Sequence, residues 1–121
     1  KMKFMAINII SPEQFTTIPW KNGRGKTTQL AISEGGDLAN FDWRLSIATV
    51  SENGIFSDFS GYSRNLVLIS GKGIHLEHDN KKVDQLEQLL DMASFDGGCK
   101  TLGKLTSGPI IDFNIMNFWI V

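Results

Sequence analysis

A period-two pattern in residues 41–76 restricts this chain to a fold built from β-strands. In the segment 43–50, Trp, Leu, Ile and Thr alternate with Arg, Ser, Ala and Val, so an extended chain presents two different faces. Asn53-Gly54 then predicts a tight hairpin between strands at 43–51 and 55–59. The apolar run 65–70 predicts a strand covered on both faces, and 71–73 turns it back into a strand at 74–78. The expected fold class is all-β: one antiparallel sheet of four strands at the core of a barrel or sandwich.

Shorter extended segments precede this stretch. A first strand is expected at 5–10, and Ser11-Pro12-Glu13-Gln14 fits a single helical turn after it. The segment 15–20 is extended, with Pro19 predicting a sheet edge because proline cannot donate to a ladder. A loop with two glycines at 20–28 leads into a strand at 27–33, and a polar loop follows at 34–40.

After residue 78 the pattern is less uniform. Asp79-Asn80 indicates a hairpin turn, whereas 81–90 fits a helical face as well as a strand edge, and both alternatives stay open. Turns at 95–98 and 107–109 flank a short strand at 100–106, and a long apolar run fills 110–121.

Length and charge limit the classes of function. A chain of 121 residues with 41% hydrophobic residues predicts a single domain over residues 1–121. A formal net charge of −1 argues against nucleic acid and membrane partners. The single cysteine, Cys99, excludes an internal disulfide, and 4–10 makes a poor signal peptide, so we expect a cytoplasmic protein.

Six motifs carry a resemblance to a known family. They are WKNGRGKTT (20–28), FDWRLSIATV (41–50), NGIFSDFSGYSR (53–64), LVLISGKG (66–73), FDGG (95–98) and DFNIM (112–116). In this order they resemble the HutD/Ves family. The resemblance implies a cupin-like, RmlC-type β-barrel and a setting near histidine-utilisation genes or among stress-associated proteins. Members continue beyond DFNIM with several more strands, which implies that the barrel is incomplete at the C-terminal end of this chain.

The same resemblance bears on metal binding. Many cupins hold a divalent ion through two His, one Glu and a later His at a set spacing before a glycine-bounded strand. Counting back from Gly71, the Glu position falls on Arg64 and the paired His positions fall near Asp58 and Ser60. We therefore expect no metal and no cofactor.

Arg44 and Arg64 are the leading candidates for ligand binding. If the Trp43 face is the outer one, Arg44 and Ser46 face the lumen, where a guanidinium requires an anionic or multi-acceptor partner. The alternatives are an internal ion pair of Arg44 with Asp42, Asp58 or Asp112, or a solvated edge. The predicted ligand-binding residues, which include the loop and nearby aromatic rings, are Trp20, Asn22, Gly23, Gly25, Thr27, Arg44, Ser46, Phe56, Phe59 and Arg64.

Three functions follow as alternatives. The first is a cupin-like protein that binds a small carboxylate metabolite, which the family context links to histidine utilisation. The second is a metal-independent, RmlC-like isomerase or epimerase with its base among His75, Glu77 and His78. The third is a structural or stress-related oligomer with a closed lumen packed by Trp43, Leu45 and Phe56.

The C-terminal run carries a prediction about assembly. If further strands normally close the barrel, a chain that stops at Val121 leaves a sheet edge unpaired. We expect a homo-oligomer in which 110–121 pairs with, or swaps into, a neighbouring subunit. The alternative is that these residues close the sheet within their own chain.

Overall fold

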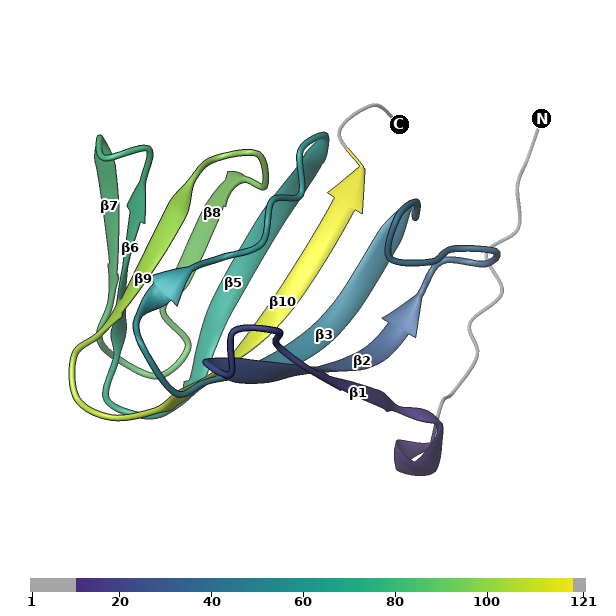
Figure 1. The fold of residues 1–121 in the computed structure, drawn as a ribbon, viewed down its shortest axis with the longest axis horizontal. Helices are drawn as coiled ribbons and strands as arrows, with labels where there is room; N and C mark the ends of the chain where they lie inside the picture. Colours follow the sequence, from purple (N-terminus) through teal and green to yellow (C-terminus); the bar gives the residue numbers. More distant parts are fainter. Residues whose placement is uncertain (1–10, 119–121) are drawn as a thin grey trace.

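Two antiparallel sheets make up the chain in a computed structural model that describes residues 11–118 (Figure 1). A 3-10 turn, η1 (Pro12–Gln14), precedes them. The larger sheet has the strand order β1-β2-β3-β10-β5-β8 and the smaller one β4-β9-β6-β7. The larger sheet contains β1 (Thr16–Pro19), β2 (Gly25–Ile32), β3 (Trp43–Val50), β10 (Ile110–Phe118), β5 (Tyr62–Ser70) and β8 (Met92–Asp96). The smaller sheet contains β4 (Gly54–Ile55), β9 (Thr101–Leu105), β6 (Ile74–His78) and β7 (Lys82–Leu86).

The all-β, antiparallel prediction is confirmed. Every strand pair of the described residues is antiparallel, and the two sheets face each other as a sandwich whose strands do not close into a barrel (Figure 1). The helical turn at Pro12–Gln14 and the edge position of Pro19 are also as predicted. The strand expected at 5–10 lies outside the described residues.

The predicted hairpin at Asn53-Gly54 is wrong. β3 pairs with β2 and β10, whereas β4 pairs with β9 of the other sheet. Neither Asn53 nor Gly54 has a positive φ. The Asn53 side chain instead accepts a hydrogen bond from the Leu105 amide at 2.8 Å, which ties the segment to β9. The chain therefore crosses between the sheets at this point.

The single four-stranded sheet predicted for residues 41–76 is wrong for the same reason. β3 and β5 belong to the larger sheet with β10 between them, and β4 and β6 belong to the smaller one. Gly71 and Gly73 do form the predicted turn, with φ values of 103° and 141°. β5 is not covered on both faces: Leu66 and Leu68 are fully buried, but Val67 on the outer face is only half-buried.

The segment at 81–90 contains a strand. Asp79 and Asn80 adopt positive φ values of 53° and 58°, and the hairpin that they form pairs β7 with β6 over Lys82–Leu86. Asp79 and Asn80 are short polar residues that tolerate the left-handed region, so they favour a strand over a helix in this segment by forming a tight turn. The resulting hairpin places Leu86 in the core.

The C-terminal run forms an interior strand. β10 pairs with β3 on one side and β5 on the other, so the edge expected to be unpaired is satisfied within the chain over Ile110–Phe118. The prediction that this segment pairs with a neighbouring subunit loses its basis. The homo-oligomer itself remains a prediction.

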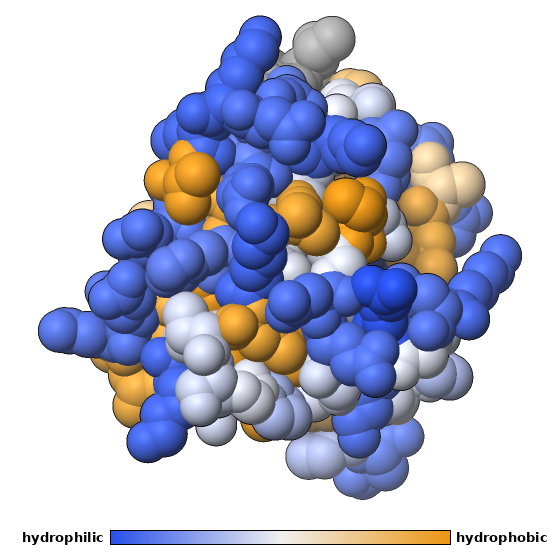
Figure 2. Space-filling view, turned by 60° about the vertical axis from the view of Figure 1, so that its left-hand side comes forward, coloured by the Kyte–Doolittle hydropathy of each residue, from blue (hydrophilic) through white to orange (hydrophobic). Residues whose placement is uncertain are grey.

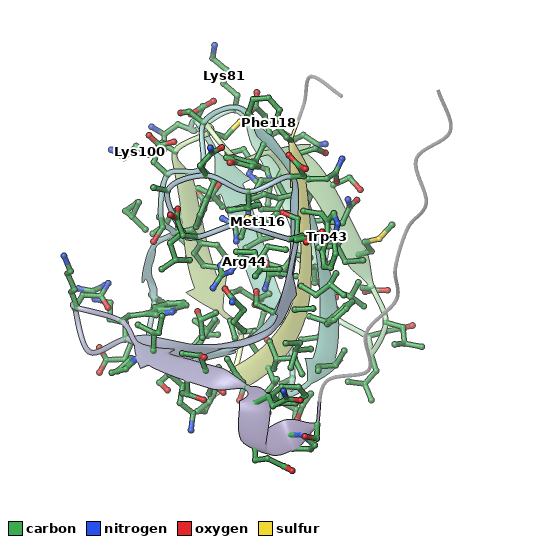
Figure 3. The ribbon with its side chains drawn as sticks, turned by 90° about the vertical axis from the view of Figure 1, so that its right-hand side faces the viewer. Trp43, Arg44, Lys81, Lys100, Met116 and Phe118 are labelled. Carbon is green, nitrogen blue, oxygen red and sulfur yellow. The ribbon has the colours of Figure 1, made fainter. Side chains whose placement is uncertain are left out.

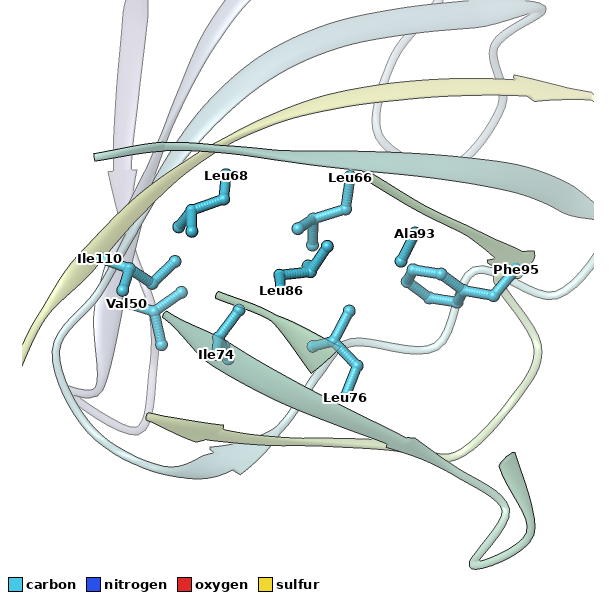
Figure 4. Packing of buried hydrophobic residues seen from close by; sticks show 9 residues of the cluster. All are labelled: Val50, Leu66, Leu68, Ile74, Leu76, Leu86, Ala93, Phe95 and Ile110. Carbon is cyan, nitrogen blue, oxygen red and sulfur yellow. The ribbon is translucent and has the colours of Figure 1, made fainter. Parts of the chain in front are cut away.

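A cluster of buried apolar side chains holds the sheets together at one end of the sandwich (Figure 4). It contains Val50, Leu66, Leu68, Ile74, Leu76, Leu86, Ala93, Phe95 and Ile110. On the face shown in Figure 2, hydrophobic atoms appear as small patches separated by hydrophilic side chains. Within residues 11–118, no helix has the length and apolarity needed to cross a membrane.

Candidate functional site

A cavity of about 510 Å³ lies beside this cluster, and a second buried cluster, Phe41, Tyr62 and Met116, lies beyond the polar part of the cavity. Its buried floor comes from three adjacent strands of the larger sheet, β3, β10 and β5, whereas β1, the loop after it and β4 supply exposed lining residues. The polar floor residues are Arg44, Ser46, Arg64, Asp112 and Asn114.

The alternation in β3 orients this floor as predicted. Arg44, Ser46 and Ala48 are buried and line the cavity, and Trp43 is exposed on the opposite face. Figure 3 shows Arg44 and Trp43 on opposite sides of the sheet. A lumen packed by Trp43 and Leu45, as the structural alternative required, is therefore wrong: both residues lie on the outer face, and a cavity is present.

The two arginines lie in one row across the sheet. Met116 of β10 is opposite Arg44 of β3 on one side and opposite Arg64 of β5 on the other. One strand therefore separates two cationic side chains that share a floor. The register brings together residues 20 positions apart in the sequence.

Arg44 has one side-chain hydrogen bond among the described residues. Its Nε donates to Gln29 Oε1 at 2.9 Å, which leaves both terminal nitrogens for the cavity. Of the ion-pair partners expected for Arg44, none lies within 4 Å in the described chain, so the internal salt bridge is not formed. Burial lowers the pKa of the Arg44 guanidinium.

Arg64 lies deeper and is surrounded by aromatic rings. Its guanidinium carbon lies 5.6, 5.5 and 5.3 Å from the ring centroids of Phe56, Phe59 and Phe95, respectively. Burial lowers the pKa of Arg64 to about 10; the Asp112 charge raises the pKa and that of Arg44 lowers it. Arg64 is therefore cationic at neutral pH.

A hydrogen-bonded chain connects Arg64 to a buried carboxyl group. Arg64 Nη2 donates to Asn114 Oδ1 at 3.1 Å, and Asn114 Nδ2 donates to Asp112 Oδ1. Burial raises the pKa of Asp112 to about 7, against the opposing effects of the Asn114 hydrogen bond and the Arg64 charge. Arg64 Nε and Asp112 Oδ2 are buried without a partner in the described chain.

The predicted loop residues divide into two groups. Trp20, Asn22 and Thr27 line the cavity, but Trp20 Nε1 donates to Thr27 Oγ1 at 2.8 Å and Asn22 Oδ1 accepts from the Arg24 amide at 2.9 Å. These hydrogen bonds stabilise the loop. Gly23 and Gly25 do not line the cavity, so their predicted place in the site is wrong.

The structure gives these glycines a backbone role. Gly23 adopts a φ of +72°, which favours glycine. A Cβ on Gly25 would come 2.2 Å from the Thr49 carbonyl oxygen, so Gly25 allows β2 to approach β3. The loop predicted before β2 is present, and its glycines shape the backbone without facing the cavity.

The three residues proposed as an isomerase base lie away from the cavity. His75 Nε2 lies 3.2 Å from Glu87 Oε1, and the Glu77 carboxylate pairs with Lys104 at 2.6 Å. His78 is buried, with Asp84 and Thr101 as hydrogen-bond partners. None of the three lines the cavity, so the isomerase hypothesis loses the base it named.

The cavity residues that were not predicted as ligands include three on β10, and a further residue, outside the cavity, holds Arg44. Asp112, Asn114 and Met116 alternate along β10, and Gln29 holds Arg44 from β2. The sequence does contain a signal for these residues. Polar residues at every second position of an apolar run indicate that the inward-facing side chains of the strand change from apolar to polar. The signal was missed because the run was treated as an edge strand. No group of three or more His, Cys, Asp or Glu side chains within residues 11–118 is arranged to hold a metal ion.

Comparison with known proteins decides the family. The HutD family model matches residues 12–118. The chain belongs to the HutD family. It is 36% identical over 110 residues to an uncharacterised 21.2 kDa protein in the hutC 3' region of Pseudomonas putida, covering 91% of this chain and 57% of that protein. It is 37% identical over 98 residues to protein Ves of Escherichia fergusonii, covering 80% and 50%.

Solved structures agree with this HutD assignment. The structure of HutD from Pseudomonas fluorescens, in a formate condition, superimposes with a TM-score of 0.81 at 37% identity, covering 89% of this chain and 58% of that one. A cupin-2 domain protein from Rhodospirillum rubrum superimposes with a TM-score of 0.64 at 12% identity, covering 96% and 77%, which shows a cupin-like fold. The chain spans about half the length of the curated relatives it matches.

Proposed function

We propose that this HutD-family chain binds a small carboxylate metabolite in the cavity, without a metal. The supporting observation is the charge of the floor: two buried guanidinium groups, Arg44 and Arg64, share it with one carboxyl, Asp112, whose pKa is about 7. At neutral pH the floor therefore carries more positive than negative charge.

The excess positive charge favours anion binding because both arginines are buried. A cation removed from water loses solvation that the protein must replace, and here neither arginine has a carboxylate within 4 Å among the described residues. An anion in the cavity would supply charge-assisted hydrogen bonds to the terminal nitrogens of Arg44. A carboxylate is well matched to a guanidinium because two oxygens meet two parallel N–H groups.

The setting of the relatives suggests which acids to test. One relative is described only by its position in the hutC 3' region. A histidine-utilisation role for this chain leads to intermediates of histidine degradation, such as formylglutamate and urocanate. Both carry carboxylates. Because this chain spans only part of the length of these relatives, a histidine-utilisation role of the whole protein is itself part of the proposal.

The test is a titration of acids into matched variants. Isothermal calorimetry with formylglutamate, urocanate and acetate should show binding to the unmodified chain. Arg64→Gln and Arg44→Gln should each weaken it by about 10- to 100-fold, because a hydrogen bond to a charged group contributes about 1.5–3 kcal/mol. Arg24→Gln is the control, since Arg24 is an exposed arginine outside the cavity.

An uncharged ligand supplies the second control. The primary amide of each acid keeps its shape and removes the charge, so it should bind far more weakly. If no acid binds, or if Arg24→Gln weakens binding as much as Arg64→Gln, the proposal fails.

A further inference from the structure

Polarity in the cavity runs opposite to that of an ordinary protein. Most of the buried lining residues are polar, with Arg44 4%, Ser46 2% and Asn114 3% exposed, although the apolar Met116 and Ala48 are equally buried. At the solvent-exposed end the lining includes large apolar side chains, with Ile18 40%, Leu38 49% and Ile55 47% exposed, beside the polar residues Lys21, Asn22 and Ser57. Protein interiors usually bury the apolar groups and leave the charged ones in water.

Three separate segments converge to make this apolar mouth. Ile18 comes from β1, Leu38 from the loop between β2 and β3, and Ile55 from β4. Between mouth and floor lie aromatic walls, where Trp20 and Phe56 meet edge to face with ring centroids 6.1 Å apart. A molecule that enters passes apolar and aromatic groups before it reaches the arginines.

The size of the cavity adds a second constraint. A volume of about 510 Å³ corresponds to roughly 17 water molecules at about 30 Å³ each. A carboxylate headgroup occupies only a small part of that space. Most of the cavity is therefore available to the body of the ligand, and the lining of this part includes the apolar groups of the mouth.

We infer that the ligand is an amphipathic acid: its carboxylate lies on the floor at Arg44 and Arg64, and an apolar body lies against Ile18, Leu38 and Ile55. This inference rests on the proposed function and specifies its ligand class. It distinguishes acids with a flat or aliphatic body from acids whose body is polar. An apolar body covers the three exposed side chains and leaves the headgroup in the part of the cavity that has buried charged donors; Lys21, the other cationic lining residue, is exposed.

A homologous series of acids tests the inference. Acetate, butanoate and hexanoate share one headgroup, so calorimetric affinities at constant ionic strength isolate the contribution of the body. We expect the affinity to rise two- to fourfold for each added methylene, the upper value being that of full burial. Hexanol, which has the body without the charge, should bind at least tenfold more weakly than hexanoate.

Substitutions at the mouth locate the effect. Leu38→Ser and Ile55→Ser should reduce the affinity for hexanoate severalfold and leave that for acetate unchanged. Both residues are largely exposed, so the fold tolerates the change. Val83→Ser is the matched control, because Val83 is an equally exposed apolar residue of β7 outside the cavity.

The outcomes separate this inference from the proposed function. Equal affinities for the three acids, with binding still lost in Arg64→Gln, overturn the amphipathic ligand and leave the carboxylate site intact. Binding of hexanol as tight as that of hexanoate overturns the head-first orientation. Failure of every acid to bind overturns both proposals.

Discussion

Two regions of the sandwich are built from the same strands and differ in chemistry. Along the inward face of β5, Leu68 and Leu66 give way to Arg64, and along that of β10, Ile110 gives way to Asp112 and Asn114. The first region is an apolar core and the next is the floor of a cavity, beyond which Tyr62 and Met116 belong to a second apolar cluster. A step of two residues along a strand moves a side chain from stabilising the fold to facing the cavity. Along each strand, substitutions in the apolar core should therefore affect mainly stability, and substitutions in the cavity floor should affect mainly binding.

The largest effect is expected in the core. Leu68→Ala removes a fully buried side chain and should lower the free energy of unfolding by about 2–5 kcal/mol, because the remaining space collapses only partly. Urea unfolding measures it. Ser46→Ala, a cavity residue without a hydrogen-bond partner in the described chain, should change stability by less than about 1 kcal/mol. Equal losses in the two variants would contradict the separation.

The next effect depends on pH and belongs to Asp112. The pKa of Asp112 is about 7 in the folded chain, and the ordinary value of an aspartate, which applies to the unfolded chain, is 3.8. Between these two pH values the folded chain therefore holds one more proton than the unfolded chain. The free energy of unfolding therefore falls as pH rises through this window, by at most about 1.4 kcal/mol per pH unit. Asp112→Asn removes the effect. The variant should match the parent near pH 4 and exceed its stability at pH 8.

The same carboxyl should affect binding. An ionised Asp112 repels an anionic ligand, so acids should bind more tightly at pH 6 than at pH 8 in the parent chain and about equally in Asp112→Asn. Parallel stability curves for parent and variant, measured by urea unfolding across pH 4 to 8, would show that folding does not raise the pKa of Asp112 and would contradict both expectations.

A smaller effect is expected where the two regions meet. The Phe95 ring belongs to the core cluster, and its centroid lies 5.3 Å from the Arg64 guanidinium carbon and 4.4 Å from the centroid of the His78 ring. Phe95→Leu keeps an apolar side chain and removes the aromatic face, so we expect a loss of about 1–2 kcal/mol in unfolding free energy. Acid affinity should fall less than in Arg64→Gln. An affinity loss larger than that of Arg64→Gln would place the ligand elsewhere.

The smallest effect is expected on the outer face of β3. Trp43 neighbours Arg44 in the sequence, yet its side chain lies on the other side of the sheet (Figure 3). Trp43→Ser should change the unfolding free energy by about 1 kcal/mol or less and leave acid affinity unchanged. Calorimetry and urea unfolding of this one variant test both parts. Loss of acid binding would show that the outer face takes part.

Local patterns in the sequence predicted which side chains face inward. The alternation in 43–50 placed Arg44 and Ser46 on the lumen side, and the structure confirms that placement. Alternation depends only on the geometry of one strand, so it needs no knowledge of the partner strands. Eight of the ten predicted ligand-binding residues line the cavity, with Gly23 and Gly25 as the exceptions, but the alternation explains only Arg44 and Ser46 among them.

Pairing between distant segments was not predictable in the same way. Asn53-Gly54 is a strong hairpin signal, but the chain crosses between sheets there because β10, more than 50 residues later, takes the place beside β3. The position of β10 also explains why Asp112 and Asn114 were not predicted as ligands: the sequence does not show that β10 lies between β3 and β5, beside Arg44 and Arg64. Long-range pairing overrides a local turn preference wherever it buries more apolar surface.

The central claim is that a carboxylate binds at the arginine-lined region and leaves the apolar core unaffected. Nitrogen-15 NMR of the chain during an acetate titration tests it directly, because each arginine Nε–H group gives its own signal. The account predicts saturable shifts of the Arg44 and Arg64 side-chain signals, with the amides of Leu68 and Leu76 unchanged. If both arginine signals stay fixed while amides elsewhere respond, the cavity floor is not the binding site.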